Sequence, residues 1–206
     1  MIKDKFFRCC KSFNQSFLLK QYTYMEEKYI LQSQIRQKHF EKFSNGNSAM
    51  PKILWNYREN KVIQNIEIIN ASKPIQNSSK TKLIEFSKNL DSLRLDVNPH
   101  GDINRKNILE NDNQLFLVDI EPVVNFKGDS KSFFMSTKPY IHYLDCDSGM
   151  VSILSDLVGF GCFSLWYMKK YEKPYLAVND SSLGNIISLA KDASCFSNLL
   201  HLILTE

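Results

Sequence analysis

The sequence has little of several features that mark particular classes of protein. Only 7 of its 206 residues are glycine, and none precedes Gly46, so the first part of the chain holds no glycine-rich loop. The 5 cysteines lack C-x2-C spacing, which fits reduced, mostly buried thiols of an intracellular protein. We therefore expect a cytoplasmic location.

Long apolar runs and a strong charge excess are also missing. The longest apolar stretch, 149–168, is interrupted by serines and an aspartate, so no membrane span is expected. The first residues are charged and no long apolar core follows, so no secretory signal is expected. A net charge of +4 does not require a nucleic-acid partner. The hydrophobic fraction of 43% suffices for the core of one domain or two small lobes.

The most informative stretch covers residues 100–121. Two short apolar runs, 107–109 and 115–118, flank a turn rich in Asn and Asp, a pattern typical of a β-hairpin. Asp102 and Asn107 stand before the turn and Asp119 after it, so the hairpin brings their oxygens to one end. Hard cations such as Mg²⁺ prefer such oxygen ligands. The simpler alternative is a hairpin whose Asn and Asp residues only cap turns.

The spacing Asp-x4-Asn, followed by an apolar run that ends in Asp, resembles the catalytic loop and metal-binding aspartate of the protein-kinase-like superfamily. The resemblance implies an α+β, two-lobed fold within a single domain, 1–206. Residues 1–73 would form a reduced N-lobe with a small antiparallel sheet and one long helix. Residues 74–206 would form a mainly helical, shortened C-lobe. ATP and Mg²⁺ would be the cofactors.

The resemblance assigns a role to each polar residue of this stretch. Asp102 would accept the proton of the acceptor hydroxyl. Asn107 and Asp119 would bind Mg²⁺, with Asp119 on the ion that bridges the β- and γ-phosphates. His100 would brace the loop. Asp156, in a buried helix expected over 152–170, would accept hydrogen bonds from catalytic-loop amides.

The expected N-lobe begins with two antiparallel strands, 6–11 and 16–22, and a helix over 25–43. A second strand pair follows at 53–57 and 62–70. The resemblance implies that Lys20 grips the α- and β-phosphates and that Glu41 pairs with it; the plain alternative is a surface lysine and an ordinary helix glutamate. The family covers the phosphates with a glycine-rich hairpin, which this sequence lacks. C-lobe helices are expected at 78–89, 183–193 and 196–204.

Two sets of residues indicate different classes of phosphate acceptor. The strings His-Gly-Asp and Asp-Ile-Glu look like aminoglycoside and choline phosphotransferases or lipopolysaccharide-core sugar kinases, and Asn104 stands where Ser/Thr protein kinases carry lysine. Gly101 replaces an arginine that would pair with a phosphorylated activation loop. The segment 119–145, by contrast, closes like the activation segment of eukaryotic-like Ser/Thr kinases.

The sequence therefore predicts a minimal bacterial-type kinase that moves the γ-phosphate of ATP to a hydroxyl. A protein Ser/Thr acceptor is favoured, and a sugar or other small molecule is the alternative. A catalytically dead pseudokinase that acts as a scaffold stays open, because the glycine-rich lid is missing.

Overall fold

The computed structural model describes the chain in twelve pieces: residues 5–11, 17–24, 38, 42, 52–59, 62–68, 73–75, 78–96, 99–111, 114–118, 153–170 and 181–205. The fold over these residues is α+β, as the sequence predicts. The helix expected over 25–43 lies outside them apart from Lys38 and Lys42, which are both helical and exposed. The segment 119–145, which is expected to close like an activation segment, also lies outside them.

Four strands form an antiparallel sheet in the order β1-β2-β4-β3. Their bounds are Lys5–Lys11 for β1, Phe17–Tyr24 for β2, Lys52–Glu59 for β3 and Val62–Ile68 for β4. The apolar and aromatic runs predicted these strands to within about two residues, the usual uncertainty of element ends. Lys20 lies within β2, opposite Cys9 of β1 and Asn65 of β4.

The predicted hairpin is confirmed and belongs to a second, three-stranded sheet in the order β5-β6-β7. Strand β5 covers Lys73–Pro74, β6 Ile108–Glu110 and β7 Leu115–Leu117, and all pairs are antiparallel. Asn111 closes the turn, because its side-chain Oδ1 accepts the backbone N–H of Gln114 at 2.9 Å. The side chains of β7 are buried, which explains its unbroken apolar run.

The four helices predicted for residues 74–206 are present. Helix α2 covers Lys80–Asp91, α4 Ile153–Tyr167, α5 Ser181–Asp192 and α6 Phe196–Thr205. Ser79 caps α2, since its side chain accepts the backbone N–H of Lys82. None of the helices within the described residues combines the length and apolar character needed to cross a membrane.

Helix α4 forms the centre of the helical core. Residues 155–164 are all buried, and the helix packs against α5 and α6. Four phenylalanines from α2, α4 and α6 contact one another, with a T-shaped pair between Phe160 and Phe196 at 5.5 Å between ring centroids. Asp91 at the end of α2 accepts the backbone N–H of Phe196 at 2.7 Å, which caps α6 and joins these two helices.

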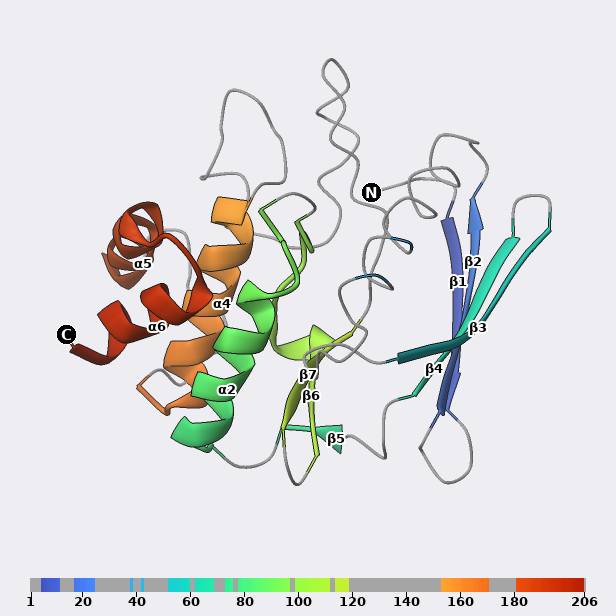
Figure 1. Cartoon of the computed structure of the whole chain (residues 1–206), viewed down its shortest axis with the longest axis horizontal. Helices are drawn as coiled ribbons and strands as arrows, with labels where there is room; N and C mark the ends of the chain where they lie inside the picture. The colour runs from blue at the N-terminus through green and yellow to red at the C-terminus, as the bar shows by residue number, and fades with distance from the viewer. Residues whose placement is uncertain are drawn as a thin grey trace, which may run out of the picture.

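Figure 1 shows how these parts are arranged. The four helices gather at one end of the molecule, the four-stranded sheet lies at the other end, and β5, β6 and β7 lie between them. The loop before β6 therefore runs beside the helical core, where α4 can hold it.

Candidate active site

The loop 100–107 precedes β6 and is fixed to helix α4 by Asp156. One carboxylate oxygen of Asp156 accepts the backbone N–H of His100 at 2.6 Å, and the other accepts the backbone N–H of Gly101 at 2.8 Å. Asp156 is 1% exposed and lies in the first turn of α4, where the helix dipole favours a carboxylate. These are the contacts that the resemblance implies for Asp156.

The backbone reverses direction between His100 and Asp102. Gly101 has φ of 80°, in the region that favours glycine. The reversal points the N–H of Asp102 back to the Nδ1 atom of His100, at 3.3 Å. His100 is 1% exposed, so this bond lies against the core and braces the loop from inside.

Two side-chain amides hold the carboxylate of Asp102. The Nδ2 atom of Asn107 donates to Oδ2 of Asp102 and to its backbone oxygen, both at 2.9 Å. The Nδ2 atom of Asn104 donates to Oδ1 of Asp102 at 2.5 Å and to the same backbone oxygen at 3.2 Å. Asp102 is half-buried, whereas Asn107 is only 7% exposed. The carboxylate is thus oriented by one amide on each oxygen.

The amide of Asn107 leaves its oxygen available. Its nitrogen is used by Asp102, and its Oδ1 accepts no hydrogen bond from any residue that the structure describes. The backbone oxygen of Asn107 accepts the N–H of Val118 at 2.8 Å, which holds the last described residue of the hairpin beside this loop. Asp119, the expected second ligand of Mg²⁺, lies outside the described residues.

The structure therefore brings together Asp102, Asn107, His100 and Asp156 from the predicted set. The backbone of Lys20 lies in β2, but its side chain is outside what is described, and Glu41 is outside altogether. Within the described pieces no group of three or more His, Cys, Asp or Glu could hold a metal.

Three contacts around the loop were not predicted from the sequence. The amide of Asn104 turns onto Asp102, as described above. The guanidinium of Arg105 lies over the ring of Trp166 in α4, 4.5 Å from its centroid. Gly159 of α4 lies so close to the carbonyl of Ile103 that a Cβ atom there would overlap the carbonyl oxygen. The presence of a glycine within an apolar helix is the signal that could have indicated such a close approach.

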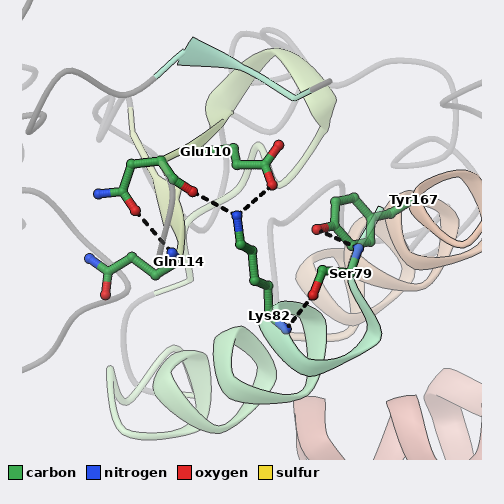
Figure 2. Close-up of polar contacts among 6 residues, drawn as sticks. Ser79, Lys82, Glu110, Gln114 and Tyr167 are labelled. Atoms are coloured by element: carbon green, nitrogen blue, oxygen red, sulfur yellow. Dashed lines mark hydrogen bonds and ion pairs between the residues drawn. The ribbon is translucent and has the colours of Figure 1, made fainter. Parts of the chain in front are cut away.

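A second polar cluster lies at the other end of the hairpin (Figure 2). Lys82 of α2 pairs with Glu110 of β6 at 2.9 Å and donates to the backbone oxygen of Asn111 at 2.7 Å. The Tyr167 hydroxyl accepts the backbone N–H of Ser79 at 3.0 Å. Burial, and then the nearby charge of Glu110, raises the pKa of Tyr167 to about 12. A tyrosine that stays neutral and hydrogen-bonded here joins α2 to α4 and has a structural role.

Comparison with known proteins adds no further information: no protein-family model matches the chain, and its sequence matches no curated protein.

Proposed function

We propose that the chain is an ATP-dependent phosphotransferase built as a minimal kinase-like domain, with a reduced N-lobe over 1–73 and a C-lobe over 74–206. The observation that carries this proposal is the geometry of the loop before β6. Asp102 is oriented by Asn107, and the loop is bound through its backbone to the buried carboxylate of Asp156. A hairpin whose Asn and Asp residues only capped turns would not require a buried carboxylate beneath it.

In this proposal Asp102 is the general base. Its carboxylate accepts the proton of the acceptor hydroxyl while the acceptor oxygen forms a bond to the γ-phosphorus. The bond from that phosphorus to the bridging oxygen of ADP breaks, so one phosphoryl group moves and one proton is released to solvent. The amides on each oxygen of Asp102 keep the carboxylate in one orientation, which is the main requirement of a positioned base.

The cofactors that this reaction needs would be held by Asn107 and by residues that the resemblance assigns. The Oδ1 atom of Asn107 and the carboxylate of Asp119 would hold Mg²⁺, and Lys20 would hold the α- and β-phosphates with Glu41 as its partner. When bound, Mg²⁺ supplies charge that offsets the negative charge of the phosphates. Asp102 holds the amide nitrogen of Asn107, so the amide oxygen of Asn107 faces away from Asp102.

We favour a protein Ser/Thr hydroxyl as the acceptor, on the close of the activation segment. One structural observation favours a sugar or small-molecule hydroxyl instead. At residue 104, where Ser/Thr protein kinases carry a lysine, the side chain is a neutral amide engaged with Asp102. An assay of the chain must therefore include both classes of acceptor.

The first experiment is thermal unfolding with and without MgATP, for the native chain and for Asp119→Asn. A ligand present at a hundredfold excess over its dissociation constant stabilises the folded state by about 2.7 kcal/mol. The proposal expects a shift for the native chain that is lost in the variant. Labelled γ-phosphate is then followed into the chain itself, into added proteins and into sugars.

Asp102→Ala is the matching test of the chemistry. It should still bind MgATP, because the backbone oxygen at residue 102 still accepts the amide of Asn107, and it should transfer nothing, because the proton acceptor is removed. Full transfer by this variant would contradict the assignment of Asp102. A native chain that shows no shift at millimolar MgATP would support the scaffold alternative, which the absence of a glycine-rich loop favours.

A further inference from the structure

We propose that Asn104 is a positioning residue for Asp102, an inference that rests on the proposed function. Neither the catalytic-loop spacing nor the resemblance gives Asn104 this role. Two side-chain amides of the loop donate to the carboxylate of Asp102, and the shorter of these two hydrogen bonds comes from Asn104.

The amide of Asn104 performs two tasks with its two ends. Its nitrogen donates to Oδ1 of Asp102 at 2.5 Å and to the backbone oxygen of Asp102 at 3.2 Å. Its oxygen accepts the backbone N–H of Lys106 at 2.8 Å and so caps the short 3₁₀ turn Arg105–Asn107. One side chain therefore connects the candidate base to the turn that presents Asn107.

The second amide adds a constraint that the first does not supply. Asn107 donates to one carboxylate oxygen of Asp102, and rotation about the Cβ–Cγ bond has a broad energy profile. The donor from Asn104 on the other oxygen restricts that rotation. A carboxylate oxygen has two lone-pair sites, so an amide N–H occupies only one of them.

Two other donors of the loop are engaged elsewhere. Arg105 is held over the ring of Trp166, and the backbone N–H of Lys106 is used by Asn104 itself. An amide is also the suitable donor chemically, because it orients the carboxylate without adding a formal charge beside it.

Asn104→Asp separates the two tasks. Aspartate is nearly the same shape and caps a turn as well as asparagine does, so the bond from the Lys106 N–H is kept. The variant has no amide donor and places a second carboxylate beside Asp102. Asn104→Ala removes the donor and the cap together. Asn185→Asp, on the exposed face of α5, makes the same chemical change far from the loop and is the matched control.

The kinetic readouts are kcat and KM for ATP, measured separately with the acceptor found for the native chain, together with the thermal midpoint. We expect Asn104→Asp to lower kcat by about tenfold to a hundredfold, the usual effect of a misplaced catalytic group, with KM for ATP changed by less than about twofold. The thermal midpoint of the Asn185→Asp control should match that of the native chain. If Asn104→Asp keeps the native kcat while Asn104→Ala loses it, Asn104 is only a cap and the proposal is wrong.

A second measurement does not depend on activity. In a ¹⁵N-labelled chain the side-chain amide signals of Asn104 and Asn107 should both shift in Asp102→Ala, whereas the signal of Asn185 should not. If the native chain transfers no phosphate, the proposed function is wrong. The comparison of amide signals then still tests whether Asn104 contacts Asp102. An Asn104 signal that does not respond to Asp102→Ala overturns the inference whatever the activity.

Discussion

Replacement of Asp156 by asparagine tests how strongly the candidate active-site loop depends on helix α4. The native carboxylate is 1% exposed and accepts the backbone N–H groups of His100 and Gly101 at 2.6 and 2.8 Å. Both bonds are short and involve an ionised acceptor, so both are of the strong, charge-assisted kind.

The size of the effect follows from the atoms that change. In Asp156→Asn one oxygen can still accept one N–H, but the new amide nitrogen faces the other N–H, and a donor then meets a donor. A lost hydrogen bond to a charged group costs about 1.5–3 kcal/mol, and a buried N–H left without a partner costs about 1–3 kcal/mol. We expect the free energy of unfolding to fall by about 2–4 kcal/mol, a large part of the 5–15 kcal/mol typical of a domain.

The assay is urea unfolding followed by circular dichroism, with hydrogen exchange at the amides of His100 and Gly101 as a local readout. Asp192→Asn makes the same change at an exposed position at the end of α5 and should alter the stability by less than about 0.5 kcal/mol. A loss below about 1 kcal/mol in Asp156→Asn, with both amides still protected, would refute the reasoning.

Three further changes test the packing around the loop, each by urea unfolding. Gly159→Ala should destabilise the fold by about 1–3 kcal/mol, because its Cβ would overlap a loop carbonyl. Gly184→Ala has open space around it and should stabilise the fold by up to about 1 kcal/mol. Equal effects of the two substitutions would contradict this reasoning. The pKa of Tyr167 is raised to about 12 from an ordinary 10.0, so the unfolded chain loses the hydroxyl proton at a lower pH than the folded chain does. The free energy of unfolding should therefore fall as the pH rises from 10 toward 12. Tyr167→Phe should reduce that fall, and an unchanged pH profile would contradict it. Lys82→Met should lower the free energy of unfolding by about 1–2 kcal/mol, whereas Lys80→Met, at an exposed position, should change it very little. Similar losses in both variants would show that the ion pair of Lys82 does not stabilise the fold.

The elements of the fold that the sequence predicts well are those with local signals. The hairpin at 107–118 is marked by two apolar runs around an Asn- and Asp-rich turn, and the observed strands β6 and β7 fall within it. Helix α4 is a mainly apolar stretch, broken only by two serines and Asp156, and it is buried over its middle turns. Such patterns depend on neighbours a few residues apart, so one sequence is enough to identify them.

Contacts between distant segments have no comparable signal. Nothing in Lys73–Pro74 indicates that it pairs with β6 as strand β5, and nothing near Asp91 indicates that it caps α6. Lys82 and Glu110 are likewise ordinary charged residues until the fold brings α2 and the hairpin together. These pairings depend on the packed arrangement of whole elements, which local propensity does not specify.

The candidate site shows the same division within a few residues. The hairpin and the resemblance predict that Asp102 and Asn107 lie together, and the structure shows the amide of Asn107 on the carboxylate of Asp102. From the sequence, Asn104 is only a departure from the lysine of Ser/Thr protein kinases, which bears on the acceptor and gives no signal of a contact with Asp102. In the structure the same residue supplies a donor, which is a property of its amide and not of its charge.

Gly101 gives a second case in which the backbone changes the interpretation of a residue. From the sequence, glycine at this position indicates the lack of an arginine that would pair with a phosphorylated activation loop. In the structure its φ is 80°, where a residue with a side chain loses about 1–2 kcal/mol. This conformation lets one short segment send the N–H of Gly101 toward Asp156 and the N–H of Asp102 toward His100. The path of the backbone therefore favours glycine at this position, whatever the role of an arginine side chain there would be.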